Sequence, residues 1–421
     1  MENEMKEIEK IVLKYGDIQS LIHYVNKETL MGEHNKQAAN KATGIDRMTK
    51  EKYNVQTEER IENLIERMKK FSYKPLPVRR AYIPKGNGEL RPLGIPAYED
   101  KLVQGVMAKC LDAVYKNEFL ECSFGFRKDR NCHQAIKELN QTIMIKKVNY
   151  IVDCDIKGYF NNVSHELLMK CMGQKVKDKN FNRYIKRFLI SGIMENDIYY
   201  ESNKGTPQGG LISPVLANIY LHYALDKWFE YQIKPSMKGE CYLIRYADDF
   251  IAMFQYENEA KQFYEQLKER MKQARLELAE EKTKIIPFGR FKGTKETFDF
   301  LGFTFSNGTT RTGKYTVNKR TSKKKMKQKK AKVKKILKED MHKGILETIK
   351  KLKKMLVGHY AYYGISGNLK SLYDYYLYTK EMLYWTKARR SQKARKYKRI
   401  IDEILKYEPL PLPKLYVSIW T

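Results

Sequence analysis

The sequence predicts an α+β fold, in which short strands form an antiparallel sheet and helices dominate both ends of the chain. Apolar residues flank the tetrapeptide Tyr246-Ala247-Asp248-Asp249, a pattern typical of a strand, a tight turn and a second strand. Apolar residues at helical spacing occur instead within residues 8–15 and 61–68, and sparsely within residues 326–337. The change of period along the chain predicts helices, then a mixed region, then helices again.

The chain has 421 residues, a length typical of about two or three domains. We expect a helical N-terminal extension over residues 1–80, the mixed region over 81–310, a helical region over 311–385 and a short basic segment over 386–421. Within the mixed region, Gly86-Asn87-Gly88 predicts the turn of a hairpin. Ser213 and Pro214 predict the cap and the first residue of a helix that ends near Phe229.

A second acidic strand is predicted upstream, at residues 150–156. Strand alternation places Ile151, Asp153 and Asp155 on one face, so two carboxylates interrupt an apolar strand. Aspartates are common in turns, and those of the strand could be paired with Lys or Arg. Alternatively, one of them meets Asp248 and Asp249 in a site for Mg²⁺, which prefers hard oxygen ligands. Two such ions about 3.5–4 Å apart serve nucleotidyl transfer, because they activate a hydroxyl and stabilise the leaving pyrophosphate.

A glycine-rich segment, Gly205–Pro214, lies between the acidic strand and the acidic turn. Glycines allow a backbone to approach a nucleotide or a template closely. Alone this segment is a weak signal, but in chain order with two acidic strands it strongly supports nucleotide chemistry.

The composition favours an anionic partner. The net charge is +31, from 81 basic and 50 acidic residues, which attracts polyanions such as nucleic acids. A basic chain could instead bind a membrane surface, but nothing favours this, and no apolar run approaches the ~20 residues that span a bilayer. The N-terminus does not resemble a signal peptide, so we expect a cytoplasmic protein without a membrane partner. The 6 cysteines form no C-x-x-C pair and the 7 histidines lack zinc-finger spacing, so no zinc ribbon, redox motif or zinc finger is indicated.

A dense run of lysines occupies residues 323–338. Such a run is usually a solvated face. Here the lysines repel one another along the predicted helix, and a bound phosphate backbone would relieve that repulsion. We therefore expect RNA contact, through Lys323, Lys324, Lys325, Lys329 and Lys330.

Taken in order, these motifs resemble those of the reverse transcriptases encoded by bacterial group II introns, which also act as maturases. The resemblance extends over nearly the whole chain. Besides the segments above, it is carried by Thr43–Asp46, Ile83–Lys85, Arg91–Pro96, Ser123–Arg127, Glu281–Lys284, Phe300–Phe303 and Gly358–Asn368. It implies a right-hand polymerase, with fingers and an antiparallel palm sheet over 81–310 and a helical thumb over 311–385. We expect a form without the C-terminal endonuclease of some relatives, in which residues 386–421 are a remnant of a DNA-binding region.

The resemblance implies the catalytic residues. In this family the first aspartate stands five residues before an aromatic residue, which selects Asp155 with Phe160 rather than Asp153. Phe160 would be the gate whose ring fills the space of a ribose 2′-hydroxyl. The implied catalytic residues and metal ligands are Asp155, Asp248 and Asp249, and Ile156 is added to the metal set.

Further residues are assigned to the substrates by the resemblance. Those expected to bind the nucleotide are Lys85, Arg91, Phe160, Gln208 and Lys282. Those expected to bind template or primer are Arg127, Gly209, Gly210, Phe300, Leu301 and Gly302. Structural alternatives stay open for Arg127, as a brace under the fingers, for Lys282, as a solvated loop residue, and for the phenylalanines, as core.

The implied activity is that of an RNA-directed DNA polymerase, which uses an RNA template, a DNA primer, deoxynucleoside triphosphates and two Mg²⁺ ions, replaceable by Mn²⁺. The resemblance also implies binding of a structured intron RNA for splicing and retrohoming, by a monomer or dimer in a bacterial cytoplasm. Two alternatives stay open: a relative recruited to DNA repair or phage defence, and a splicing factor with little polymerase role. The bulky Phe160 disfavours an RNA-dependent RNA polymerase.

Overall fold

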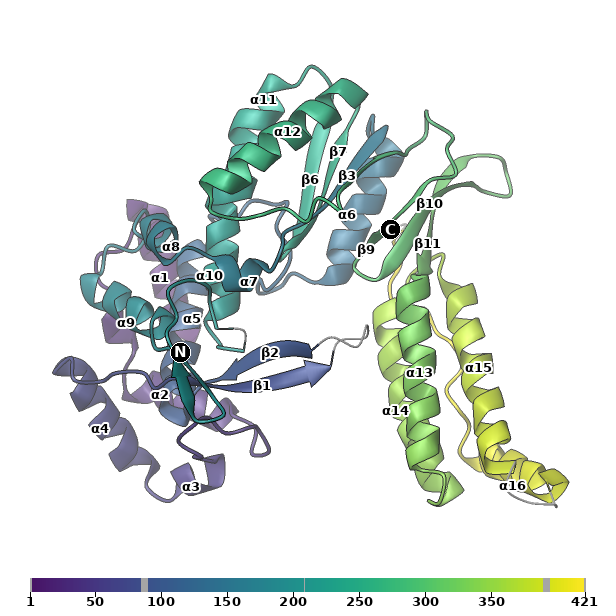
Figure 1. Ribbon diagram of the computed structural model, residues 1–421, viewed down its shortest axis with the longest axis horizontal. Coiled ribbons are helices and arrows are strands. Elements are labelled where there is room, and N and C mark those ends of the chain that lie inside the picture. The colour runs from purple at the N-terminus through teal and green to yellow at the C-terminus, as the bar shows by residue number, and fades with distance from the viewer. Residues whose placement is uncertain (1, 85–89, 208, 389–393, 420–421) are drawn as a thin grey trace. The chain divides into compact units, whose positions relative to one another are not determined.

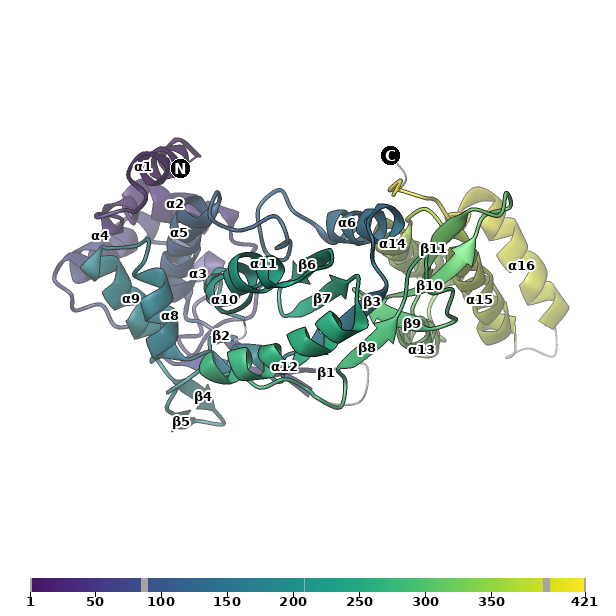
Figure 2. The same ribbon diagram turned by 90° about the horizontal axis from the view of Figure 1, so that it is seen from above.

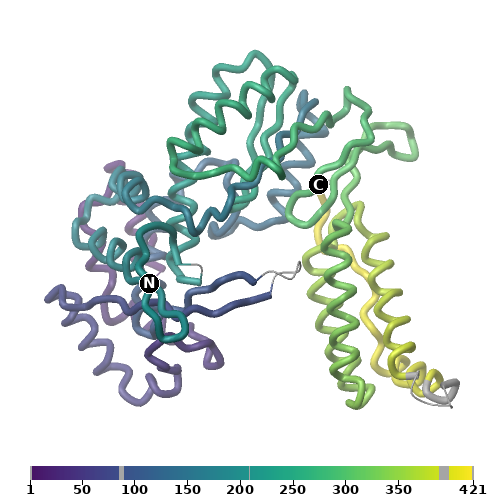
Figure 3. The backbone as a smooth tube through the Cα atoms, in the orientation of Figure 1, coloured from purple at the N-terminus to yellow at the C-terminus, as the bar shows by residue number. Residues whose placement is uncertain are grey.

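The computed structural model describes residues 2–84, 90–207, 209–388 and 394–419, and the chain forms two compact units. Unit 1 comprises Met1–Asn131, Cys154–Ala252 and Asn258–Lys284, and unit 2 comprises Cys132–Asp153, Met253–Glu257 and Ile285–Thr421. Figure 3 shows the backbone trace of the chain, coloured by residue number. Each unit is therefore built from segments that are far apart in the sequence, and the division into extension, fingers, palm and thumb stays a prediction.

The N-terminal part of unit 1 is helical, as predicted. Its elements are α1 (Glu2–Tyr15), η1 (Ile22–Tyr24), α2 (Lys27–Lys36), α3 (Lys50–Asn54) and α4 (Thr57–Lys69). Helices α1 and α2 pack against the long helix α5 (Tyr98–Tyr115), as Figure 2 shows. Ile8 and Val12 of α1 and Ile61 and Leu64 of α4 are buried, so the helical period in the sequence marks the buried stripes.

Unit 1 contains a four-stranded sheet in the order β2-β1-β4-β5. β1 (Val78–Pro84) and β2 (Leu90–Ile95) form an antiparallel pair in which Pro84 lies opposite Leu90. β4 (Ile193–Glu195) runs parallel to β1, and β5 (Ile198–Tyr200) runs antiparallel to β4. The predicted hairpin is confirmed, and its predicted turn, Gly86-Asn87-Gly88, lies outside the described residues.

The helix predicted to begin at Ser213 is present, but the prediction that Ser213 is its N-cap was wrong. In α10 (Ser213–Leu221) the N-cap is Ile212, and Ser213 is already the first helical residue. The Ser213 hydroxyl donates to the carbonyl oxygen of Pro207, 2.8 Å away, and so closes the glycine-rich turn. The other helices between residues 159 and 273 are α7 (Tyr159–Asn162), α8 (His165–Met172), α9 (Lys179–Leu189), the π-helical turns η2 (His222–Asp226) and η3 (Phe229–Ile233), α11 (Lys234–Ser236) and α12 (Glu257–Gln273).

A second four-stranded sheet, in the order β6-β7-β3-β8, carries the acidic motifs. Only Ala247 and Asp248 separate β6 (Cys241–Tyr246) from β7 (Asp249–Phe254), so the predicted strand, turn and strand are confirmed. β3 (Tyr150–Asp155) is the predicted acidic strand, and β8 (Lys284–Pro287) lies beside it at the edge. The central strands β3 and β7 bury nearly all their apolar side chains, which explains their almost continuous apolar sequences.

Unit 2 combines a three-stranded antiparallel sheet with helices (Figure 1). The strands are β9 (Thr297–Phe300), β10 (Phe303–Thr309) and β11 (Tyr315–Thr321). Lys319 of β11 is fully buried and donates to Asn140 Oδ1 of α6 (Cys132–Ile145) at 2.7 Å. Burial lowers the pKa of Lys319 to about 8.

The C-terminal helices of unit 2 are α13 (Lys323–Glu339), α14 (Ile345–Tyr363), α15 (Leu369–Ala388) and α16 (Ala394–Tyr407). Helix α13 confirms the predicted lysine-rich helix, and it packs against α15 and buries Val333 and Leu337. Helix α16 was not predicted, because the sequence there was interpreted only as basic. None of the helices in the described ranges combines the length and apolar character needed to cross a membrane.

Candidate active site

The acidic turn holds a strained backbone. Ala247 has a φ of 59°, a left-handed conformation that costs an ordinary L-residue about 1–2 kcal/mol. Asp248 follows it in the turn, and Asp249 is the first residue of β7. Such strain persists only where the surrounding structure enforces it.

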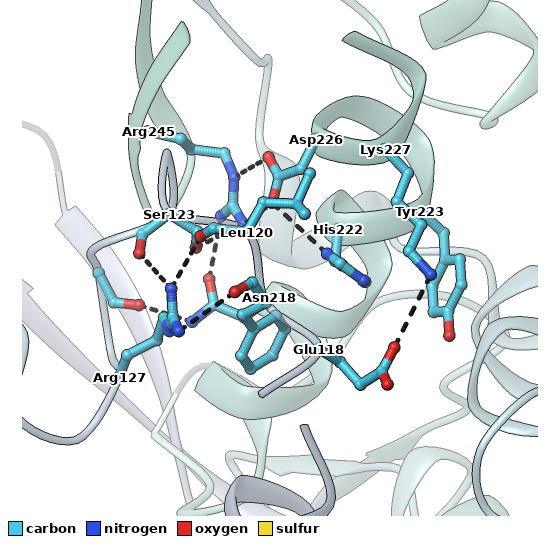
Figure 4. A network of polar contacts seen from close by, with 12 residues as sticks. Glu118, Leu120, Ser123, Arg127, Asn218, His222, Tyr223, Asp226, Lys227 and Arg245 are labelled. Atoms are coloured by element: carbon cyan, nitrogen blue, oxygen red, sulfur yellow. Dashed lines mark hydrogen bonds and ion pairs between the residues drawn. The ribbon is translucent and has the colours of Figure 1, made fainter. Parts of the chain in front are cut away.

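A buried arginine enforces this turn. The guanidinium of Arg245, on β6, forms a two-point ion pair with Asp226, with Nε 2.6 Å from Oδ1 and Nη2 2.5 Å from Oδ2 (Figure 4). Its Nη1 donates to the carbonyl oxygen of Ala247 at 2.9 Å and to Asn218 Oδ1 at 3.0 Å, and its Nη2 donates to Ser123 Oγ at 2.8 Å. The carbonyl that immediately precedes Asp248 is therefore fixed by a fully buried cation.

The pKa of Arg245 depends on its partner, Asp226. Burial disfavours the positive charge, but the Asp226 carboxylate outweighs burial, and the pKa of Arg245 is raised. Arg245 thereby connects β6 with η2, with α10 and with the loop around residue 123, and all four elements meet at the acidic turn.

The loop at residues 122–127 lies directly against the same turn. The amide of Phe124 donates to the carbonyl oxygen of Arg245 at 2.8 Å. Gly125 approaches so closely that a Cβ there would lie 2.4 Å from the backbone nitrogen of Ala247. Asn218 Nδ2 donates to the Gly125 carbonyl oxygen at 2.6 Å and holds the loop in place. Glycine is required here because any side chain would displace the acidic turn.

Arg127 is committed to this loop. Its Nη1 donates to the carbonyl oxygens of Leu120 and Ser123 at 2.9 and 2.7 Å, and the guanidinium lies 5.2 Å from the ring centre of Phe119. These contacts favour the structural alternative, in which Arg127 braces the loop. A contact with the template stays a prediction.

Two carboxylates and two cations share one electrostatic environment at the turn. Burial raises the pKa of Asp248, and the nearby Asp155 carboxylate raises it further, whereas the charge of Arg91 acts in the opposite direction. Lys282 Nζ lies 2.7 Å from Asp155 Oδ2, so Lys282 forms an ion pair at the acidic site, and its side chain is 62% exposed to solvent. The structure thus brings together Asp155, Asp248, Arg91 and Lys282.

The donor set at this site fits a divalent cation. No group of three or more His, Cys, Asp or Glu side chains within the described residues is arranged to hold a metal ion. However, Asp155 and Asp248 repel each other in a partly buried site, and a cation bound by their hard oxygen atoms would relieve that repulsion. The assignment of Asp155, Asp248, Asp249 and Ile156 as metal ligands stays a prediction.

The expected gate residue, Phe160, belongs to the short helix α7. Its backbone is fixed, because the Thr206 amide donates to the Phe160 carbonyl oxygen at 2.7 Å and the neighbouring Tyr159 hydroxyl donates to the Ala217 carbonyl oxygen at 2.5 Å. The glycine-rich turn therefore packs directly against the backbone of Phe160. Two predicted nucleotide contacts, Lys85 and Gln208, lie outside the described residues.

The glycine-rich turn also contacts strand β2. Gly209 has a φ of 113°, and a Cβ there would lie 2.6 Å from the carbonyl oxygen of Gly94. The Gly210 amide donates to the Pro207 carbonyl oxygen at 3.0 Å. Backbone packing therefore explains Gly209, whereas a Cβ at Gly210 would first meet the side chain of Gln104, at 2.9 Å. The expected contact of both glycines with a template stays a prediction.

Comparison with known proteins decides the family. Residues 83–305, more than half of the chain, match the family described as Reverse transcriptase (RNA-dependent DNA polymerase). This protein belongs to the reverse transcriptase family. The predicted right-hand polymerase fold is thereby confirmed, and the mixed helices and antiparallel sheets of the structure agree with it.

The curated relatives of this reverse transcriptase include intron-encoded proteins. The chain is 42% identical over 185 residues to the group II intron-encoded protein LtrA of Lactococcus lactis subsp. cremoris, covering 44% of this chain and 30% of LtrA. It is 31% identical over 240 residues to the protein YkfC of Escherichia coli (strain K12), covering 49% of this chain and 62% of YkfC. The chain thus spans less than two thirds of the length of either relative. The expected resemblance to group II intron reverse transcriptases is confirmed.

In this reverse transcriptase, the residues predicted to contact the primer form a tight turn. Leu301 and Gly302 join β9 to β10 with φ values of 49° and 80°. Phe300 and Phe303 are buried, so core packing is the correct interpretation of the phenylalanine rings. The Tyr362 hydroxyl donates to the Leu301 carbonyl oxygen at 3.0 Å and supports the turn, whose contact with a primer stays a prediction.

The lysines of α13 are largely exposed. Lys323, Lys324 and Lys325 form the exposed first turn of the helix, whereas Lys329 and Lys330 are half-buried. Burial lowers the pKa of Lys329, and the Lys330 ammonium lies 4.7 Å from the ring centre of Tyr378. Their contact with RNA stays a prediction.

Sequence reasoning missed the Arg245 network. The signal was available, because Arg245 interrupts the apolar run Tyr242-Leu243-Ile244 directly before the acidic turn. A charged residue inside a buried strand requires a partner, but nothing in the sequence identified that partner as Asp226, 19 residues away.

Replacing Arg245 with Met should leave Asp226 buried without its cation. We expect the free energy of unfolding, measured with urea, to fall by about 3–5 kcal/mol. Adding Asp226→Leu removes the orphaned charge and should restore much of the stability. Neither variant retains the donor to the Ala247 carbonyl, so primer extension should stay impaired in both. Full recovery of primer extension in the double variant would contradict the role given to Arg245.

Replacing Asp248 with Asn should stabilise the metal-free protein at pH 7. The folded-state pKa of Asp248 lies above the unfolded value of about 3.9, so its ionisation destabilises the fold as the pH rises through the interval between them. We expect a higher melting temperature for Asp248→Asn at pH 7 in the presence of a chelator, and a difference that shrinks towards pH 4. Asp374→Asn, at an exposed position on α15, is the matched control. A lower melting temperature for Asp248→Asn at pH 7 would rule out this interpretation.

Proposed function

We propose that this chain is an RNA-directed DNA polymerase that extends a DNA primer on an RNA template with deoxynucleoside triphosphates. The observation that carries the proposal is the acidic turn within the family-matched region. Arg245 fixes the carbonyl before Asp248, and the Asp155 carboxylate is close enough to raise the pKa of Asp248. A protein that only binds RNA would not need these mutually repelling carboxylates, because they reduce the stability of the fold and add no binding surface.

The proposed chemistry uses two Mg²⁺ ions held by Asp155, Asp248 and Asp249. When bound, the ions activate the primer 3′-hydroxyl and stabilise the leaving pyrophosphate. The residues of the chain do the rest. Arg91, whose charge acts on Asp248, is assigned to the triphosphate, whose oxygens it would bind by charge-assisted hydrogen bonds. Lys282, which pairs with Asp155, supplies a second positive charge that would neutralise negative charge on the phosphates.

Selection of deoxynucleotides is assigned to Phe160. Its backbone is held from two sides, by Thr206 and by the buried Tyr159. A side chain on such a rigid support can exclude a 2′-hydroxyl by steric overlap, because the overlap cannot be relieved by moving the backbone.

A second role, in binding a structured intron RNA for splicing and retrohoming, is supported by the intron-encoded relative and by α13. The exposed first turn of α13 carries three consecutive lysines, and a phosphate backbone would neutralise them. We propose that this activity takes place in the bacterial cytoplasm.

Primer extension on an RNA template with Mg²⁺ tests the polymerase. Deoxynucleotides should be incorporated and ribonucleotides should not. Asp248→Ala should abolish incorporation with little change in RNA affinity, because it removes a carboxylate and no phosphate contact. Asp374→Ala, an exposed carboxylate on α15, should leave incorporation unchanged. Synthesis by Asp248→Ala would remove the acidic turn from the mechanism, and RNA binding without synthesis by the parent would favour a splicing factor.

The RNA surface on α13 is tested by salt dependence. Replacing Lys323 and Lys324 with Gln should weaken RNA binding and reduce the slope of log affinity against log salt by about 1.5, because two phosphate contacts are lost. The matched control variant replaces Lys350 and Lys354 with Gln. Both lysines are exposed and lie on α14, the next helix in the sequence. Equal slopes for the two variants, measured by fluorescence anisotropy, would show that α13 is merely solvated.

A further inference from the structure

Phe126 is an exposed aromatic residue on a strained backbone. It is 51% exposed and has a φ of 56°, a left-handed conformation that favours glycine or asparagine. The backbone conformation costs free energy, and the exposed ring recovers little of it by burial. Folding alone therefore does not explain a phenylalanine here, and strain of this kind is characteristic of functional sites.

The residues on both sides of Phe126 hold it in this conformation. The carbonyl oxygen of Gly125 accepts a hydrogen bond of 2.6 Å from Asn218 Nδ2. The guanidinium of Arg127 is fixed to the carbonyl oxygens of Leu120 and Ser123. Phe126 is thus presented from a rigid loop that rests on the acidic turn.

The ring of Phe126 lies against the ring of Phe160. Their centres are 6.5 Å apart and their planes meet at 85°, an edge-to-face arrangement. The backbone of Phe160 is fixed by Thr206, but its half-buried ring needs a neighbour to keep it in one rotamer. On its other side the ring of Phe160 contacts Tyr159, with centres 5.5 Å apart. Phe126 supplies the exposed wall of this aromatic group.

We propose that Phe126 is a positioning residue for sugar selection, and that its ring restrains Phe160 in the rotamer that excludes a ribose 2′-hydroxyl. The inference rests on the proposed function, in which Phe160 is the gate. Edge-to-face pairs are strong enough to change a rotamer equilibrium by roughly two- to tenfold. Without Phe126, the Phe160 ring can turn aside and admit ribonucleotides.

The test compares kcat/KM for a deoxynucleotide and its ribonucleotide on one RNA template and DNA primer. Phe126→Ala should lower this ratio by about two- to tenfold, mainly through a lower KM for the ribonucleotide. Phe126→Tyr preserves the edge-to-face contact and should retain the parental ratio. Phe126→Gly removes the ring and relieves the strain, so it should lower the ratio while melting at the same or a higher temperature. Phe291→Ala, at an exposed phenylalanine of unit 2, is the control and should change nothing.

A double-variant cycle separates positioning from an independent contact. If Phe126 acts through Phe160, Phe126→Ala/Phe160→Ala should have the same ratio as Phe160→Ala alone. Additive losses would overturn the inference and indicate that Phe126 contacts the template or nucleotide itself. Normal deoxynucleotide incorporation with an unchanged ratio in Phe126→Ala would overturn the inference alone. No incorporation by the parent protein would overturn the proposed function, and this inference with it.

Discussion

The buried ion pair between Arg245 and Asp226 is the interaction on which the candidate site depends. Both side chains are fully removed from solvent, and transferring two charges out of water costs several kcal/mol for each ion. Replacement by apolar residues would be expected to cost nothing in stability, so the value of this pair lies in what it positions. The planar guanidinium has donors enough to reach the carbonyl of Ala247, the amide of Asn218 and the hydroxyl of Ser123 while it keeps both bonds to Asp226. A lysine, with a single ammonium, could not fix four elements at once.

The acidic turn built on this pair is unfavourable for folding and suited to chemistry. Burial and the Asp155 carboxylate both raise the pKa of Asp248, so at neutral pH the folded chain holds a carboxylate whose charge is disfavoured. Arg91 and Arg245 act in the opposite direction on Asp248, and Lys282 forms a solvent-exposed ion pair with Asp155 at 2.7 Å. Sites that bind cations commonly lower the stability of the cation-free fold, because the same repulsion between carboxylates that destabilises the fold strengthens the binding of a cation.

Two strained backbone conformations lie at the acidic turn and at the loop packed against it. Ala247 and Phe126 both have left-handed φ values, and a Cβ at Gly125, next to Phe126, would lie 2.4 Å from the backbone nitrogen of Ala247. The Ala247 carbonyl is held by the side chain of Arg245, two residues earlier in the chain, and the loop of Phe126 is held by Asn218 of α10. The site is therefore rigid because its parts restrain one another.

The sequence by itself determined the elements and the family. Apolar runs around a turn predicted the acidic hairpin, and a glycine-rich turn predicted the hairpin of β1 and β2. Period-3.6 patterns predicted the helices α1, α4 and α13, because such a pattern is a local consequence of burying one face. The resemblance to group II intron reverse transcriptases, carried by the order of the motifs, selected Asp155, Asp248 and Phe160 as the candidate site residues. Only the tertiary structure decided what those residues touch: that Asp226 is the partner of Arg245, that Lys282 meets Asp155 across 127 positions of sequence, and that Phe126 faces Phe160. These contacts join segments distant in the chain, and their energies depend on burial and geometry, which local sequence patterns do not encode.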